Sequence, residues 1–374
     1  MEVKKLKKTI LINSGRTSPF LNTRKDLINN IDKEKYNVIV TGSEYGYEKE
    51  LEKMNVRFIK TNVFRTSLNP FKDILLLLSY YNIIKKNNVD IVHSYTIKPN
   101  IFGTLAAKLA GVSNIYPTLN GIGYVFTENT FKARKLRYLI KFLYKRVFKS
   151  SKKVIFQNID DANEFINLKI IPSEKAIVVN GSGINLEKFP YKENSLVPSF
   201  ILVTRLLKSK GVMEFLKAAE IIKHKYPEIK FSLVGPLDPN PNGIKINDIN
   251  SYVEKGIVDY LGKRNDISNV LHKHSVFVLP SFYREGVPHS ILEAMSSGKV
   301  IITTDSPGCR ETVIDGKNGF LIPVKDENKL AEKMEWLINN NSILPKMGLE
   351  SYKYAKNKFE VNTVNESIYN TMEL

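Results

Sequence analysis

Residues 276–311 read VFVLPSFYREGVPHSILEAMSSGKVIITTDSPGCRE, and this stretch decides the predicted fold. The apolar segment Val276–Pro280 has the composition of a buried strand, and Val300–Thr304 follows as a second one. Between them, Pro288 suits the first position of a helix, where its missing N–H is not needed. Gly298 suits the position just after the end of that helix. The order strand, loop, helix, strand predicts a parallel sheet with a helical crossover.

The loop before this helix has the features of an anion site. Gly286 and Val287 lie just ahead of the helix, so their backbone N–H groups and the positive end of the helix dipole are exposed. Glu285 and Glu293 flank the site. A carboxylate repels phosphate, so both are better explained as acceptors for the hydroxyl groups of a sugar or ribose. Taken alone, such a pair also arises by chance, as a loop residue and a solvated helical residue.

Short apolar strands alternate with helical segments along the rest of the chain. The predicted strands are Thr9–Asn13, Asn37–Thr41, Arg57–Lys60, Ile91–Ser94, Ile115–Thr118, Val154–Gln157 and Ile177–Val179 in the first half, and Phe200–Thr204, Lys230–Val234, Val258–Leu261, Val276–Leu279, Val300–Thr304 and Phe320–Pro323 in the second. This alternation predicts an α/β fold with two doubly wound parallel sheets. A stretch punctuated by Gly and Pro, near residues 180–198, separates the two series and indicates a linker. The predicted domains are therefore residues 1–185 and 195–355. Because doubly wound sheets bind ligands at strand carboxyl ends, two facing sheets would place the active site in the cleft between domains.

Length and composition fit an enzyme with two cores. The chain has 374 residues, of which 43% are hydrophobic. Its longest apolar run, Ile74–Ile84, is about half of a membrane span, and the apolar segment Thr9–Ile12 is too short for a signal peptide. The single cysteine, Cys309, excludes an internal disulfide and favours a reducing compartment. The five histidines form no ligand cluster and no DxD-type carboxylate pair is present, so we expect no metal and no cofactor.

Positive charge is concentrated in the first half of the chain. Residues 1–180 contain 31 Lys and Arg against 15 Asp and Glu, which gives +16 of the total net charge of +18. The densest part, residues 130–153, has ten basic residues and no acidic one. Its apolar residues recur along one helical face, namely Leu136, Leu139, Ile140, Leu143 and Val147. The basic residues that we expect to face a partner are Lys141, Lys145, Arg146 and Lys149.

A basic amphipathic helix is typical of a membrane-surface element. An ordinary domain helix with solvated lysines is the alternative, and the helix by itself does not decide between them. The charge of the whole first half favours an anionic membrane surface as the partner. The sequence contains no RRM-, KH- or helix-turn-helix-like pattern, so we expect no nucleic-acid partner.

The string around Glu285 and Glu293 resembles the E-x7-E signature of the retaining glycosyltransferases of family 4. Residues 200–211, FILVTRLLKSKG, resemble the R-L-x-x-x-K-G element of the same family. The resemblance implies the GT-B fold, in which two Rossmann-like domains face each other across a cleft. In that fold the chain end returns to the first domain, so residues 356–374 are expected to form a helix that packs back on it.

The resemblance also implies a donor site for a nucleotide sugar. The residues that it assigns are Arg205, Lys210, Gly286, Val287, Glu293, Gly15 and Arg264. Arg205 and Lys210 would hold the diphosphate through charge-assisted hydrogen bonds, although surface residues at a helix entry are the alternative explanation. Glu293 would accept from the ribose, and Glu285 would act as a catalytic residue by orienting the donor sugar. Gly15 belongs to a reduced glycine-rich loop, and Arg264 to a segment that resembles the nucleobase loop.

Two loops of the first half are expected to hold the acceptor, near His93 and Asn120. These loops, Asp90–Pro99 and Thr118–Thr127, together with Val234–Asp238 and Val258–Gly262, resemble one branch of family 4. That branch includes N-acetylgalactosaminyltransferases that extend undecaprenyl-diphosphate-linked sugars in bacterial glycan assembly. Many family members have His where Asn120 stands, so a histidine role does not transfer to this position. His289 stands where Arg is commoner in the branch.

The sequence therefore predicts a metal-independent hexosyltransferase. It would move a sugar, an N-acetylhexosamine such as GalNAc, from a UDP-sugar to a polyprenyl-diphosphate-linked saccharide, with retention and without an enzyme nucleophile. We expect a cytoplasmic protein that is peripheral on the inner face of the plasma membrane. One alternative is a UDP-sugar epimerase of the same fold, which needs no acceptor. A basic nucleic-acid-binding protein is another, but it leaves both glutamates and the Arg205/Lys210 pair unexplained.

Overall fold

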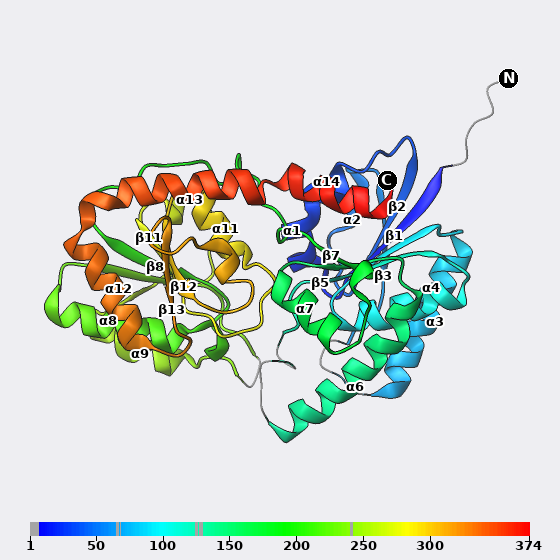
Figure 1. The fold of residues 1–374 in the computed structure, drawn as a ribbon, viewed down its shortest axis with the longest axis horizontal. Coiled ribbons are helices and arrows are strands. Elements are labelled where there is room, and N and C mark those ends of the chain that lie inside the picture. The colour runs from blue at the N-terminus through cyan, green and yellow to red at the C-terminus, as the bar shows by residue number, and fades with distance from the viewer. Residues whose placement is uncertain (1–6, 65–66, 68, 124–125, 127–129, 240–241) are drawn as a thin grey trace. The chain divides into compact units, whose positions relative to one another are not determined.

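The computed structural model describes residues 7–374 apart from 65–66, 68, 124–125, 127–129, 240–241 and the side chain of Lys132 (Figure 1). The chain divides into two compact units, and each is described by itself. Unit 1 comprises residues 1–182 and 362–374, and unit 2 comprises residues 183–361. The predicted boundaries differ in two places. Residues 186–194, predicted as linker, belong to unit 2, and helix α13 (Leu344–Phe359) keeps the chain in unit 2 past residue 356 because Phe359 is buried in its core.

Unit 1 is built on a seven-stranded parallel sheet with the order β3-β2-β1-β4-β5-β6-β7. Its strands are β1 (Lys8–Asn13), β2 (Tyr36–Gly42), β3 (Val56–Lys60), β4 (Ile91–Tyr95), β5 (Asn114–Leu119), β6 (Val154–Phe156) and β7 (Ala176–Val178). Its helices are α1 (Thr17–Asn29), α2 (Glu48–Glu52), α3 (Pro70–Lys86), α4 (Thr104–Leu109), α6 (Phe131–Val147), α7 (Ile159–Asn167) and α14 (Val361–Met372). The carboxyl ends of all these strands lie at one edge of the sheet.

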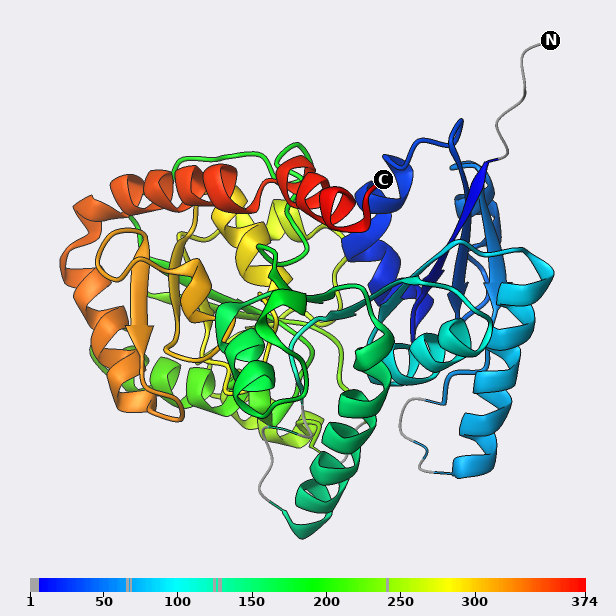
Figure 2. The same cartoon turned by 45° about the vertical axis from the view of Figure 1, so that its right-hand side comes forward.

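Helices cover both faces of this sheet, as the alternation of side chains along a strand requires. Ile10 and Ile12 of β1 pack in a core with residues of α1 and with Val364 and Ile368 of α14. Leu11 points the other way, into a core formed with α3 and α4. A further core on unit 1 joins α6 and α7 to β6. Because α14 completes one of these cores, the last residues of the chain are an integral part of unit 1 (Figure 2).

Unit 2 contains a six-stranded parallel sheet with the order β10-β9-β8-β11-β12-β13. Its strands are β8 (Ser199–Val203), β9 (Lys230–Val234), β10 (Asp259–Tyr260), β11 (Val276–Leu279), β12 (Val300–Thr304) and β13 (Gly319–Ile322). Its helices are α8 (Val212–Lys225), α9 (Ile246–Glu254), α10 (Ile267–Leu271), α11 (His289–Ser296), α12 (Glu327–Asn339) and α13. One large apolar core runs through this unit.

The strand predictions agree with the structure within one residue at each end, because the buried strands are short apolar runs with turn residues on either side. The two doubly wound sheets are those that the sequence predicts. One local detail differs: Pro288 is the extended residue that precedes α11 rather than its first helical residue. Among the helices of the described part of the chain, none combines the length and the hydropathy that crossing a bilayer requires.

Candidate active site

Two loops at the carboxyl ends of β8 and β11 pack tightly together in unit 2. Gly211, just before α8, has a φ of +76°, and a Cβ atom there would lie 2.1 Å from the carbonyl oxygen of Pro280. The backbone N–H groups of Phe282 and Tyr283 both donate to the carbonyl oxygen of Ser209, at 3.0 Å. Gly211 is therefore required by close packing, and the packing fixes Lys210 beside the loop that carries Glu285.

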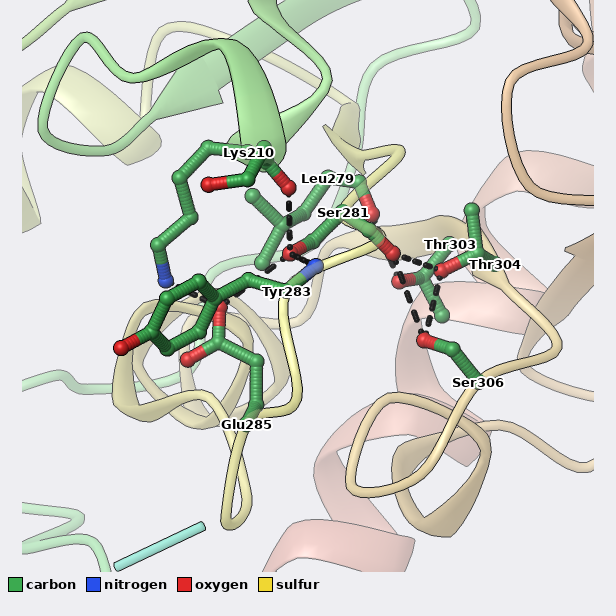
Figure 3. Close-up of polar contacts among 9 residues, drawn as sticks. Lys210, Leu279, Ser281, Tyr283, Glu285, Thr303, Thr304 and Ser306 are labelled. Atoms are coloured by element: carbon green, nitrogen blue, oxygen red, sulfur yellow. Dashed lines mark hydrogen bonds and ion pairs between the residues drawn. The ribbon is translucent and has the colours of Figure 1, made fainter. Parts of the chain in front are cut away.

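Lys210 and Glu285 form an ion pair where these two loops meet, a place called the corner of unit 2 below. Their side chains are only 12% and 13% exposed (Figure 3). The Oγ atom of Ser281 lies 3.2 Å from Glu285 Oε1. The Lys210 ammonium also lies 5.3 Å from the centre of the Tyr283 ring. The cation predicted for the diphosphate and the carboxylate predicted for the sugar are thus brought together, at the strand ends where doubly wound sheets bind ligands.

Hydroxyl groups on and just after strand β12 form hydrogen bonds to the backbone of this corner. The carbonyl oxygen of Ser281 accepts from Thr304 and from Ser306, and Thr303 Oγ1 donates to the carbonyl oxygen of Leu279 at 2.7 Å (Figure 3). All of these side chains are buried. Such a network of satisfied buried groups fixes the loop before substrate arrives.

Gly286 and Val287 lie between this corner and α11. Gly308 has a φ of +79°, and a Cβ atom there would lie 1.7 Å from the carbonyl oxygen of Gly286. Cys309, next to it, is fully buried, and burial raises the pKa of its thiol, as expected of a packed turn residue. Pro288, which precedes helix α11, makes no side-chain cap, and the positive end of the helix dipole lies at this start.

Glu293 lies in the second turn of α11, with His289 one turn before it. His289 Nδ1 is 3.0 Å from Glu293 Oε1, and both side chains are largely buried. The histidine that differs from the commoner arginine thus contacts the glutamate predicted to bind the ribose. The sequence indicates both residues but not that they pair.

The two other cations predicted for the donor both have carboxylate partners. Arg205 Nη1 lies 2.8 Å from Asp238 Oδ2. Arg264 makes two hydrogen bonds to Asp266, at 2.8 and 2.7 Å, and its side chain is exposed. The arginine and the segment after β9 therefore meet at one edge of the sheet, whereas Arg264 is fixed within its own turn.

The predicted residues of unit 1 have very different surroundings. Gly15 is buried after β1, and a Cβ atom there would lie 2.9 Å from Thr96 Oγ1. His93 is completely buried on β4, with Nε2 2.8 Å from Thr118 Oγ1, so no part of it faces solvent in this structure. Burial, together with the nearby Arg24 guanidinium, lowers the pKa of His93 to about 3, which keeps the ring neutral. Asn120, after β5, is exposed.

Three residues near Asn120 escaped prediction from the sequence. Asn120 Oδ1 accepts from Gln157 Nε2 at 3.2 Å and lies 3.5 Å from Nη2 of the buried Arg24. The Arg24 guanidinium stands 5.1 Å from the centre of the Tyr95 ring. Arg24 resembles any basic residue on an amphipathic helix, so no sequence signal distinguished it. The rest of the predicted acceptor loop, up to Thr127, lies partly outside the described residues.

Helix α6 carries Lys141, Lys145, Arg146 and the flanking Lys149 on unit 1. The last three are exposed, and Lys141 is half-buried above the ring of Phe126. The predicted apolar face is buried in part, since Ile140 and Val147 lie in the core while Leu139 is half exposed. Among the described residues, no group of three or more His, Cys, Asp or Glu side chains could hold a metal ion.

Comparison with known proteins agrees with this geometry. Residues 184–358 match the model of glycosyl transferases group 1, and residues 10–158 match that of glycosyl transferase 4-like domains. The chain is 33% identical to the N,N'-diacetylbacillosaminyl-diphospho-undecaprenol alpha-1,3-N-acetylgalactosaminyltransferase of Campylobacter jejuni, over 86% of each chain. It is also 33% identical to the UDP-Gal:alpha-D-GlcNAc-diphosphoundecaprenol alpha-1,3-galactosyltransferase of Escherichia coli, over 70% of this chain and 69% of that one.

Solved structures share the fold at lower sequence identity. A glycosyltransferase from Rickettsia africae superposes with a TM-score of 0.80 at 21% identity and covers 98% of each chain. The Anabaena protein HepE, in complex with UDP, superposes with a TM-score of 0.76 at 18% identity, over 98% of this chain and 99% of that one. Together with the parallel sheets and the E-x7-E loop, these matches show that the chain is a GT-B glycosyltransferase and belongs to family 4.

Proposed function

We propose that this glycosyltransferase moves a sugar from a UDP-sugar, an N-acetylhexosamine such as GalNAc, to a saccharide linked to a polyprenyl diphosphate. The observation that carries the proposal is the Lys210–Glu285 pair beside the start of α11, since it places a cation, a carboxylate and the positive end of a helix dipole in one corner. The two relatives at 33% identity support the acceptor class, because their names specify undecaprenyl-diphosphate-linked acceptors.

The residues of unit 2 suggest how the donor would bind. Arg205, Lys210 and the N–H groups of Gly286 and Val287 would hold the diphosphate and stabilise the charge that develops on it as it leaves. Lys210 would then contact both the diphosphate and Glu285. Glu285 would accept from the donor sugar and orient its anomeric carbon, and Glu293 would accept from the ribose.

The reaction would need neither a metal nor an enzyme nucleophile. Cys309, the single cysteine of the sequence, is buried with a raised thiol pKa, so it is a poor candidate for a nucleophile. The acceptor hydroxyl would attack from the face that the diphosphate leaves, and the departing diphosphate would take its proton. The positive charge around the diphosphate, rather than a metal, would then stabilise the transition state.

We also propose that unit 1 binds the inner face of the plasma membrane through α6. Its exposed surface has the aromatic and apolar side chains Phe131, Tyr138, Leu139 and Phe142. Exposed basic residues, Lys145, Arg146 and Lys149 among them, lie along the same helix. Aromatic rings at the headgroup level and cations near anionic lipid are the two contributions of an interfacial helix.

Helix α3 extends this surface. Phe71, Ile74, Leu75 and Leu78 follow the spacing of one helical face, and each is at least 50% exposed. The amino-terminal ends of α3 and α6 project from the same side of unit 1, at its lower edge in both views (Figures 1 and 2). Each Lys or Arg near an anionic leaflet contributes about 1 kcal/mol, so several cations with an apolar anchor would give reversible binding.

The decisive experiment is a screen of UDP- and GDP-sugars against prenyl-diphosphate-linked saccharides, read by mass spectrometry, with the anomeric configuration read by NMR. We expect product with a UDP-N-acetylhexosamine and retention of configuration. Conversion of the UDP-sugar without any acceptor would identify the epimerase instead. Absence of transfer to every prenyl-diphosphate acceptor would overturn the proposed acceptor class.

A further inference from the structure

Arg24 in unit 1 is a buried cation that has no carboxylate partner among the residues that the structure describes. Arg24 of α1 is 1% exposed, and its Nε and Nη1 atoms have no hydrogen-bond partner among the described residues. The remaining nitrogen, Nη2, makes only a long contact of 3.5 Å to Asn120 Oδ1. Burial lowers the pKa of the guanidinium, and the interaction with Tyr95 opposes this effect. A buried charge without partners is costly, so this arrangement needs a reason.

A second basic side chain lies beside the first. His93 is buried near Arg24, and the two influences on its pKa, burial and the guanidinium, both act against a charge on the ring. No carboxylate contributes at either residue in the described part of the chain. The interior of unit 1 is therefore electropositive where Arg24 lies.

The place of this cluster in the fold points to a ligand. Tyr95 ends β4, Asn120 follows β5 and Gln157 follows β6, so the groups around Arg24 come from three adjacent strand ends. Doubly wound sheets bind ligands at this edge. Asn120 is exposed, so an oxygen that replaced Asn120 Oδ1 at Nη2 would reach the guanidinium from the solvent side. The fork of an arginine matches the oxygens of a phosphate group.

We propose that Arg24, together with Asn120 and Gln157, forms an anion site in unit 1 that takes the diphosphate of the lipid-linked acceptor. The inference rests on the proposed function for the identity of the acceptor. Unit 2 already provides Arg205 and Lys210 for the diphosphate of the nucleotide sugar. The acceptor's diphosphate is the other anion in the proposed reaction, and it fits the Arg24 guanidinium, whose Nε and Nη1 have no partner among the described residues.

The test compares the whole enzyme with its Arg24→Met and Arg24→Lys variants, and with Lys25→Met as a control. Lys25 is the neighbouring residue, is exposed and pairs with Glu50, so its loss removes the same charge from the same helix. The acceptor is a farnesyl-diphosphate-linked saccharide. We expect Arg24→Met to raise its KM at least tenfold, with a smaller change in kcat and no change in the affinity for UDP. Arg24→Lys should have an acceptor KM between those of Arg24→Met and the parent, and Lys25→Met should have the same acceptor KM as the parent.

Thermal unfolding without ligand separates this role from a structural one. Removal of an unpaired buried charge should leave the Tm of Arg24→Met unchanged or raised. An unchanged acceptor KM in this variant, with or without a lowered Tm, would overturn the site. A loss of UDP affinity would assign the anion to the donor instead and overturn the acceptor assignment. Should Arg24→Met fail to fold, Arg24→Lys decides by the same KM criterion.

Direct binding keeps the test independent of the proposed function. If the parent enzyme transfers sugar to no prenyl-diphosphate acceptor, the proposed function has failed. Titration calorimetry with inorganic pyrophosphate, in the presence of saturating UDP, still tests the anion site. Binding that is at least tenfold weaker in Arg24→Met supports it, and equal binding overturns it.

Discussion

The two units place cations at their strand ends in opposite ways. In unit 2, Lys210 is paired with Glu285, and Arg205 with Asp238. In unit 1, Arg24 and His93 are buried with no carboxylate contributing to either in the described residues. The cations of unit 2 thus have carboxylate partners, whereas those of unit 1 have none in the described part of the chain. The difference suggests that unit 2 is preorganised for its ligand and that unit 1 obtains part of its stability from one.

The same contrast appears on the surface. Of the net charge of +18, the residues of unit 1 carry +14 and those of unit 2 only +4. Exposed apolar side chains on α3 and α6 accompany the positive charge of unit 1. A surface that is both basic and apolar suits a bilayer better than it suits a nucleic acid, which offers no apolar layer to contact.

The largest effect on activity should come from removing the charge of Glu285, which breaks its ion pair with Lys210. We expect Glu285→Gln to reduce kcat by ~100- to 1,000-fold, the cost of removing a group that acts on the transition state. The Kd for UDP should hardly change, because the proposed contact of this carboxylate is with the sugar rather than with the nucleotide. Initial rates and calorimetry measure the two quantities. Glu327→Gln, in the exposed Lys217–Glu327 pair of the same unit, is the matched control. Near-normal turnover of Glu285→Gln would remove the residue from the mechanism.

The surface of unit 1 can be neutralised without touching unit 2. Replacing Lys141, Lys145, Arg146 and Lys149 by Gln should weaken binding to anionic liposomes about 100-fold. Three of the four are exposed, and each contributes about 1 kcal/mol near anionic lipid. Sedimentation measures the binding, which should also weaken with added salt. Activity on a short water-soluble acceptor should survive.

The control for this quadruple variant replaces four exposed lysines of unit 2 by Gln and so removes the same charge. They are Lys217, Lys225, Lys255 and Lys329. This variant should bind liposomes nearly as well as the parent. Equal binding by the α6 variant and the parent would mean that the lysines of α6 are simply solvated. A separate variant with Ser at Phe71 and Leu75 sharpens the result, because it tests the apolar contribution of α3 alone.

Breaking the Arg205–Asp238 ion pair of unit 2 should weaken binding of the donor. Arg205→Ala should weaken binding of UDP and of the UDP-sugar by roughly 1.5–3 kcal/mol, the value of a hydrogen bond to a charged group. Calorimetry with UDP measures the change, and Lys217→Ala in the exposed pair serves as the control. Unchanged UDP affinity in Arg205→Ala would make the diphosphate assignment wrong.

The smallest predicted effect is the contribution of His93 to the loss of folding stability at acid pH. Its folded-state pKa is lowered to about 3 from 6.5, so the unfolded state binds the proton first as the pH falls. Stability is then lost progressively below pH 6.5, by about 2 kcal/mol between pH 7 and pH 5 from this residue. His93→Gln should lose correspondingly less over that interval in urea unfolding. His224→Gln, at an exposed site, should follow the parent, and an identical pH dependence for His93→Gln would show that the buried ring is not the cause.

Prediction from the sequence succeeded where local pattern determines structure. Apolar runs fixed the strands, and the spacing of Glu285 and Glu293 marked the corner of unit 2. It missed features that depend on tertiary contacts. His93 lies within the predicted strand Ile91–Ser94, but the complete burial of its ring depends on packing against Tyr95 and Thr118. Arg24 looks like a solvated helical residue, and only the fold buries it. The aromatic side of α6 was likewise missed, because periodicity cannot say which face a neighbour covers.

The return of the chain to unit 1 has a consequence for synthesis. Val364, Ile368 and Met372 belong to the same core as Ile10 and Ile12, although more than 350 residues lie between the two groups in the sequence. The first segment of unit 1 is synthesised before unit 2, yet the core of unit 1 also needs residues 364–372, which follow the uninterrupted unit 2. The unit that carries most of the charge and the exposed apolar helices can therefore complete its core only after the whole of unit 2 has been synthesised.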